Sequence, residues 1–156
     1  MSKLTPEYVF SADRFAERIG LISEALPGIP LVYSMKANPF LLHCLPEKID
    51  MVEVCSPGEL AICENLSVPG EKILYSGVVK GSEDSLRAVK LGAKYLTAES
   101  KNQFEIVKKA AEETGIRADI LLRLSSGNQF GMSREDLLSI IETERDSSSV
   151  RIAGTR

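Results

Sequence analysis

The chain has 156 residues, of which 44% are hydrophobic and 26% are charged, and its formal net charge is −3. This composition is that of a soluble globular domain, and it excludes a collagen-like or intrinsically disordered chain. The slight acidic excess gives no basic surface for a nucleic acid. No apolar run reaches the roughly 18 residues of a membrane-spanning helix, so we expect no membrane partner.

Cysteine and histidine, the usual residues of disulfide and metal sites, are scarce. Cys44, Cys55 and Cys63 are odd in number and have no C-x-x-C spacing, and His43 is the one histidine. We therefore expect neither a disulfide framework nor a metal site, and a reducing cytoplasm fits this use of cysteine. His43 is expected to be solvated or packed rather than catalytic.

Short β-rich runs alternate with amphipathic helical segments along the whole chain. The seven predicted strands are residues 8–10, 31–35, 51–54, 72–75, 94–97, 120–124 and 150–153. Helix starts between them carry N-capping residues, most clearly Ser56 with Glu59 and Ser100 with Gln103, which have capping-box spacing. Asn38, which precedes a proline, predicts a further helix start. The pattern indicates repeated β/α units.

The order of these units favours a barrel. Strands separated by helices run parallel, because each helix returns the chain to the same edge of the sheet. An open doubly wound sheet and a closed β/α barrel both accept this pattern, but no Gly-rich dinucleotide turn follows the first strands. Since such a barrel needs at least about 200 residues, we predict a (β/α)8 TIM-type barrel that is incomplete, with about six to seven units present. Its active site is expected at the carboxyl ends of the strands.

Lys36 is the sharpest candidate for chemistry. It ends an apolar strand within the segment Tyr-Ser-Met-Lys-Ala-Asn-Pro, residues 33–39, and a capped helix begins two residues later. In a barrel, this position lies at the mouth, where a lysine that loses hydration becomes a nucleophile toward carbonyl groups. A surface lysine at a strand end is the alternative that spacing alone leaves open.

The segment 33–39 resembles the pyridoxal phosphate lysine motif of the ornithine/diaminopimelate decarboxylase family, whose members have an alanine-racemase-like barrel. Three further segments match that family in chain order. They are Val-Glu-Val-Cys-Ser-Pro-Gly-Glu-Leu at 52–60, Ile-Leu-Tyr-Ser-Gly-Val-Val-Lys at 73–80, and the segment 121–132 with its Leu-Leu-Arg-Leu and Gln-Phe-Gly-Met. The resemblance covers about residues 5–154, nearly the whole chain.

The resemblance implies a cofactor and three site residues. The cofactor is pyridoxal phosphate, which acts as an electron sink in decarboxylation. Lys36 is implied as the catalytic residue, which forms the Schiff base and later donates a proton. Glu53 occupies the family's acidic position, where Asp is common, and is expected to pair with Lys36. Arg123 resembles the family's arginine that faces the site, and pairing with a neighbouring carboxylate is the alternative.

Other residues in the matching segments have simpler expectations. Ser56 and Glu59 are explained by helix capping, although Glu59 has the better claim of the two to face the site. Cys55 and Cys63 are expected in the core, because cysteine behaves as a small buried hydrophobe. Lys80 is expected to be solvated. Gln129 replaces a lysine that is commoner in the family and resembles the branch with carrier-bound substrates.

The resemblance also implies residues that the 156 do not include: a stacking histidine, a Gly-rich phosphate loop and a second, β-rich domain. We therefore expect residues 1–156 to be an N-terminal pyridoxal phosphate-binding barrel portion of a longer enzyme, without its C-terminal β domain. The implied enzyme is a homodimer that decarboxylates an amino acid. Its small-molecule substrate belongs to the ornithine, lysine or diaminopimelate class or is bound to a carrier protein.

Three other functions stay open at this stage. The first is a non-catalytic barrel protein that binds pyridoxal phosphate, and the segment 33–39 argues against it. The second is a pyridoxal phosphate-dependent amino-acid racemase, whose lysine segment usually continues with a Tyr-Gly pair that is absent after Asn38. The third is a scaffold without a ligand. Binding of pyridoxal phosphate at Lys36 would exclude the scaffold but not the two functions that use this cofactor.

Overall fold

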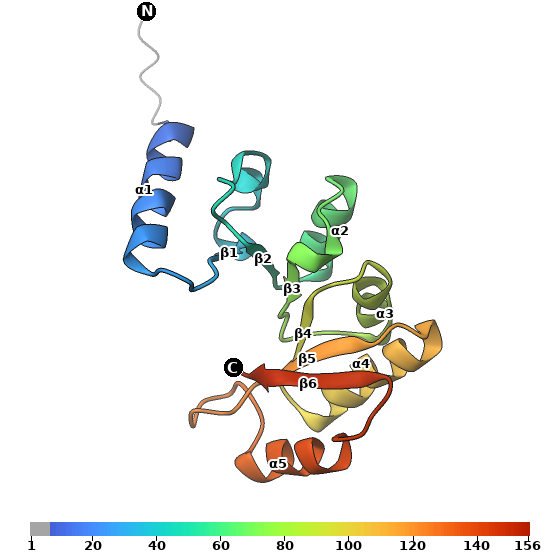
Figure 1. Cartoon of the computed structure of the whole chain (residues 1–156). Coiled ribbons are helices and arrows are strands. Elements are labelled where there is room, and N and C mark those ends of the chain that lie inside the picture. Colours follow the sequence, from blue (N-terminus) through green and yellow to red (C-terminus); the bar gives the residue numbers. More distant parts are fainter. Residues whose placement is uncertain (1–6) are drawn as a thin grey trace, which may run out of the picture.

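Six parallel strands form one sheet in the computed structural model, which describes residues 7–156 (Figure 1). They are β1 (Val32–Ser34), β2 (Met51–Val54), β3 (Ile73–Tyr75), β4 (Tyr95–Ala98), β5 (Ala118–Leu122) and β6 (Val150–Thr155). Each strand pairs with the next one along the chain. A doubly wound sheet reverses its strand order, whereas a barrel does not, so the sequential order confirms the predicted barrel architecture. Within residues 7–156, β1 and β6 are the two edges of the sheet.

Within residues 7–156, one α-helix precedes β1, and four further α-helices and three short 3-10 helices lie between the strands. The α-helices are α1 (Ala12–Ala25), α2 (Pro57–Asn65), α3 (Ser82–Lys90), α4 (Lys101–Thr114) and α5 (Arg134–Thr143). The 3-10 helices are Met35–Ala37, Pro39–Cys44 and Gly70–Lys72. Figure 1 shows the chain advancing unit by unit from α1 at one end of the molecule to α5 at the other. None of the helices within residues 7–156 has the length and apolar character to cross a membrane.

The predicted helix caps at Ser56 and Ser100 are confirmed. In α2, the return hydrogen bond of the capping box goes to the residue before the cap instead of to the cap itself. The Ser56 hydroxyl accepts a hydrogen bond from the amide of Glu59 at 3.2 Å, and Ser100 does the same for Gln103 at 3.2 Å. The Glu59 carboxylate accepts from the amide of Cys55, one residue before the cap, at 2.8 Å. Glu59 therefore closes the start of α2.

One predicted strand is wrong. Residues 8–10 form no strand, and their side chains are exposed. They have the β propensity of a strand but pair with no strand of the sheet within residues 7–156. The helix start predicted at Asn38 is confirmed: the 3-10 helix Pro39–Cys44 begins there, and the Asn38 side chain accepts from the amide of Phe40 at 3.1 Å.

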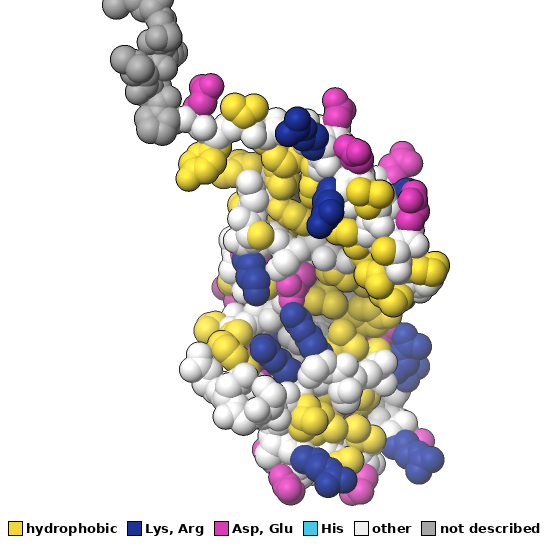
Figure 2. Space-filling view, turned by 90° about the vertical axis from the view of Figure 1, so that its left-hand side faces the viewer, with side chains coloured by type: hydrophobic (Ala, Val, Ile, Leu, Met, Phe, Trp, Pro, Cys, Tyr) yellow, Lys and Arg dark blue, Asp and Glu magenta, His cyan; other side chains and the backbone are white. Residues whose placement is uncertain are grey.

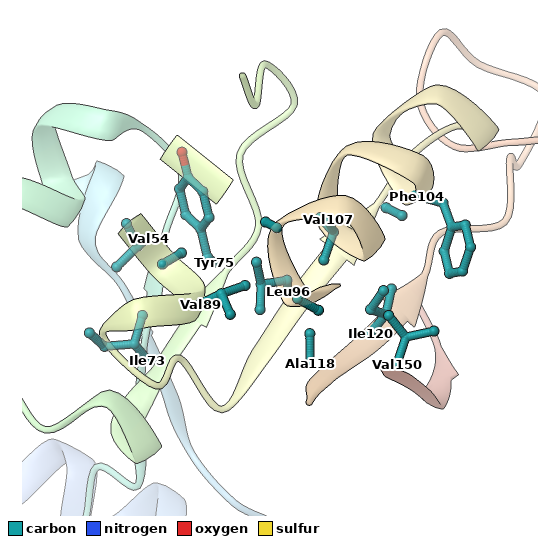
Figure 3. Packing of buried hydrophobic residues seen from close by; sticks show 14 of the residues in the cluster. Val54, Ile73, Tyr75, Val89, Leu96, Phe104, Val107, Ala118, Ile120 and Val150 are labelled. Atoms are coloured by element: carbon teal, nitrogen blue, oxygen red, sulfur yellow. The ribbon is translucent and has the colours of Figure 1, made fainter. Parts of the chain in front are cut away.

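The hydrophobic core lies on the face of the sheet that the helices cover. Successive residues of a strand point to opposite faces, so alternate residues of each strand enter this core. Figure 3 shows strand residues, among them Ile73, Leu96 and Ile120, packed with Val89 from α3 and Phe104 from α4. The opposite face carries Ser34 beside Glu53 and Thr97 beside Leu121, and Ser76 follows β3 on the same face. Polar residues therefore gather on the face away from the helices, at the carboxyl ends of the strands.

Tyr75 gives a test of this core. Its ring is completely buried, and its hydroxyl has no hydrogen-bond partner in the part of the chain described here. Because an unsatisfied buried hydroxyl costs free energy, Tyr75→Phe is expected to leave the free energy of unfolding unchanged or to raise it. The control is Tyr33→Phe, which removes the 2.7 Å bond to the Asn38 carbonyl and is expected to cost about 1 kcal/mol. Urea unfolding measures both, and a larger loss for Tyr75→Phe contradicts the expectation.

Candidate active site

A cavity of about 420 Å³ opens at the carboxyl ends of the strands. Its lining includes Lys36, Glu53, Cys55, Ser76 and Arg123, together with Arg156. Figure 2 views the molecule from the side toward which β6 points, and basic and acidic side chains gather there near the middle of the face. The three residues that the sequence singled out, Lys36, Glu53 and Arg123, thus line one cavity at the expected end of the barrel.

A second hollow of about 440 Å³ lies at the opposite end of the sheet. It contains Lys94 and Arg117, both exposed, and Arg151, which is paired with Asp119. No nucleophile stands beside an activating group in this hollow. The cavity at the carboxyl ends is therefore the candidate active site.

Lys36 lies in the 3-10 turn Met35–Ala37 directly after β1. The turn is anchored by Met35, which is completely buried, and by the hydrogen bond from Tyr33 to Asn38. The Lys36 side chain is exposed, so the loss of hydration expected at this strand end is not observed. Among residues 7–156, no hydrogen bond or ion pair involves its amine. Lys36 is thus presented to the cavity by a fixed backbone, with a free amine.

Glu53 is held by three donors. The hydroxyl of Ser34 donates to Oε2 at 2.6 Å, and that of Ser76 donates to Oε1 at 2.7 Å. Arg156 Nη2 lies 2.5 Å from Oε1. Burial by itself raises the pKa of Glu53, but these hydrogen bonds outweigh it and lower the pKa to about 2. The expected pairing with Lys36 is not found, because these other donors occupy the Glu53 oxygens.

Arg123 combines both of its predicted roles. It lines the cavity, and its Nη1 donates to Glu99 Oε1 at 2.7 Å. Its guanidinium group also lies over the ring of Phe130, 4.8 Å from the centroid. A planar cation that is paired at its edge and stacked on its face has one preferred orientation. Arg123 is therefore a fixed positive charge in the cavity wall.

The prediction that Lys80 is solvated is wrong. Only 5% of Lys80 is exposed, and its amine donates to the Gly77 carbonyl and to Thr97 Oγ1. Burial lowers the pKa of Lys80 to about 8. One signal in the sequence was usable, because Lys80 ends a segment that matches the decarboxylase family and follows β3 closely. Its burial depends on the path of the loop after β3, which spacing alone does not define.

The expectations for Cys63 and Cys55 have different outcomes. Cys63 is buried as predicted, but Cys55 is wrong as a core residue because it is half-buried and lines the cavity, with Sγ 3.5 Å from Ser76 Oγ. His43 and Gln129 are exposed. No three His, Cys, Asp or Glu side chains in the described range 7–156 come together as metal ligands.

Comparison with known proteins identifies the family. The family model described as "Pyridoxal-dependent decarboxylase, pyridoxal binding domain" matches residues 12–140. The chain belongs to this family of pyridoxal-dependent decarboxylases. The matched region is the pyridoxal-binding domain, so pyridoxal phosphate is the cofactor that the cavity has to accommodate.

Individual relatives are similar over most of this chain. The diaminopimelate decarboxylase of Mycobacterium leprae is 36% identical over 79% of this chain and 27% of its own length. That of Zymomonas mobilis is 27% identical over 96% of this chain and 41% of its own length. A lysine/ornithine decarboxylase of Vibrio vulnificus, solved with putrescine, is 25% identical, with a TM-score of 0.77 over 92% of this chain and 39% of that one. The chain thus spans less than half the length of these relatives.

The residues of the cavity fit pyridoxal phosphate. A volume of about 420 Å³ lies within the usual range for cofactor sites. Lys36 supplies a free amine for an aldehyde, and Arg123 and Arg156 supply positive charge for anionic groups. Glu53 supplies a buried carboxylate. The donor set therefore matches the chemistry of an anionic aldehyde.

Proposed function

We propose that residues 1–156 are the N-terminal pyridoxal phosphate-binding barrel portion of an amino-acid decarboxylase and that Lys36 carries the cofactor. The observation that supports this most strongly is the meeting of Lys36, Glu53 and Arg123 around one cavity. These residues follow or end three different strands, β1, β2 and β5. Such convergence at the carboxyl ends is typical of barrel active sites.

Each of the three residues has a separate task in this proposal. Lys36 bonds the cofactor through its Nζ and later carries a proton on that atom. Pyridoxal phosphate supplies an electron sink for the carbon that loses its carboxylate. Arg123, fixed by Glu99 and Phe130, attracts an anionic group into the cavity. Glu53 keeps a permanent negative charge there, because its pKa is about 2.

The relatives support a proposal for the substrate class. Their names cover diaminopimelate, lysine and ornithine decarboxylases, and the Vibrio structure contains putrescine, a diamine. We assign the enzyme a small amino acid with a second amine, and a carrier-bound amino acid is the variant indicated by Gln129. A homodimer in the cytoplasm completes the proposal, and the three cysteines, none of them in a disulfide, are in keeping with a reducing compartment.

The test locates the cofactor chemically. Pyridoxal phosphate is added to the 156-residue protein, the adduct is reduced with borohydride, and mass spectrometry of the digest identifies the labelled lysine. Label is expected at Lys36 and is expected to disappear in Lys36→Ala. The matched control is Lys72→Ala, since Lys72 is exposed and does not line the cavity. Label that is distributed among many lysines and unchanged by Lys36→Ala contradicts the proposal.

A further inference from the structure

The Glu53 carboxylate lies between two serine hydroxyls, one from each side. The register of the sheet places Ser34 opposite Glu53 across β1 and β2. It places Leu74 opposite Glu53 across β2 and β3, so Ser76, two residues further, points to the same face. Backbone pairing therefore brings the three side chains together before any of them adjusts its rotamer.

The two serines occupy both oxygens of the carboxylate. Ser34 donates to Oε2 at 2.6 Å and Ser76 to Oε1 at 2.7 Å. These short contacts are hydrogen bonds to a charged acceptor, which are stronger than neutral ones. Only 7% of Glu53 is exposed, so little water competes with the hydroxyls. The direction of the Glu53 side chain is thus set by Ser34 and Ser76, with Arg156 on the side of Oε1.

Lys36 is close in the chain to one of these serines but makes no contact with Glu53. It follows Ser34 by two residues and lines the same cavity as Glu53, yet within residues 7–156 its amine has no carboxylate partner. The other charged groups of the cavity have partners of their own. Arg123 is bound to Glu99, and Asp84 accepts from the amide of Gly81 at 3.3 Å.

A carboxylate next to a lysine stabilises the protonated amine, which is not a nucleophile. We infer that Ser34 and Ser76 are positioning residues that hold Glu53 away from Lys36 and so keep the Lys36 amine free to react. The inference rests on the proposed role of Lys36. It gives a task to two hydroxyls that are bound to a carboxylate in the same cavity as Lys36.

The first test is the titration of Glu53. Carboxyl carbons are followed by NMR in Ser34→Ala and Ser76→Ala, and Glu53→Gln assigns the resonance. Each serine variant is expected to raise the pKa of Glu53 by about one unit, because a hydrogen bond to the charged form is lost. The control is Ser85→Ala, because Ser85 is a completely buried serine whose hydroxyl has no partner among the described residues.

The second test measures Lys36 without any cofactor. The rate of acetylation of Lys36 by an N-hydroxysuccinimide ester is determined by mass spectrometry at neutral pH. In the double variant Ser34→Ala/Ser76→Ala the rate is expected to fall about threefold, the size of the effect of a partly exposed ion pair. Adding Glu53→Gln to the double variant is expected to restore the rate, because the released carboxylate is then absent.

Two results overturn the inference. One is a Glu53 pKa in Ser34→Ala and Ser76→Ala equal to that in Ser85→Ala, and the other is a Lys36 acetylation rate in the double variant equal to that in Ser85→Ala. Neither readout uses pyridoxal phosphate. If both shift as expected while pyridoxal phosphate labels lysines other than Lys36, the positioning of Glu53 is supported and the proposed function fails.

Discussion

Replacing Phe104 by alanine is expected to lower the free energy of unfolding by about 3–5 kcal/mol. Phe104 belongs to α4 and is only 1% exposed. Figure 3 shows its ring on the helix side of the sheet, near the labelled Ile120 and Val150. Alanine removes a whole ring from a region packed at the density of a crystal, so both transfer energy and contacts are lost. Such a loss is a large fraction of the stability of a small domain.

Urea or thermal unfolding measures this loss, and the chain contains its own control. Phe40 is 82% exposed, so Phe40→Ala makes the same chemical change without opening a cavity. The control is expected to change the free energy of unfolding by less than about 0.5 kcal/mol. Equal effects of the two substitutions contradict the packing described for α4.

Replacing Gly131 by alanine is expected to cost at least about 2 kcal/mol and to disturb the cavity wall. Gly131 has a φ of +83°, and a Cβ there lies 2.7 Å from the amide nitrogen of Ser125 and 2.9 Å from the carbonyl oxygen of Arg123. Both are backbone atoms that cannot rotate away. They belong to the hydrogen bonds that join Met132 to Ser125 and Arg123, each 2.9 Å long.

The same loop carries Phe130 onto the guanidinium group of Arg123, so Gly131→Ala affects more than stability. We expect weaker binding of an anionic ligand such as pyridoxal phosphate, measured by titration of the folded variant. Gly127→Ala is the control, because Gly127 has a similar φ of +87° but no atom within 4 Å of the added Cβ. It is expected to cost about 1 kcal/mol. A loss as large as that of Gly131→Ala assigns the effect to φ alone.

Much of the fold is predictable from local patterns. The positions of β2 to β6 and the caps at Ser56 and Ser100 follow from hydrophobic runs and capping spacing, which act over a few residues. Residues 8–10 show the limit of this reasoning. A strand exists only when a neighbour pairs with it, and local composition does not contain the neighbour.

The candidate site also contains some residues that the sequence predicted and some contacts that it did not. Lys36 was predictable from its place after an apolar strand, whereas Glu53 and Arg123 were predicted through the resemblance to the decarboxylase family; all three line one cavity. The serine donors of Glu53 and the burial of Lys80 were not, because they depend on strand register and on the path of one loop. A shift of one residue in register turns Ser34 to the other face and removes its bond to Glu53.

The strictly sequential strand order has a consequence for folding kinetics. Each strand pairs with the next one along the chain, and most paired strands begin roughly twenty residues apart. The chain segment that each pairing closes into a loop is therefore short, and its entropic cost is small. Parallel strand pairing at this separation still forms more slowly than the local contacts of a helical bundle. The cavity, however, draws on β1, β2, β3 and β5, which span most of the chain. The cavity therefore takes its shape only when most strands of the sheet have paired.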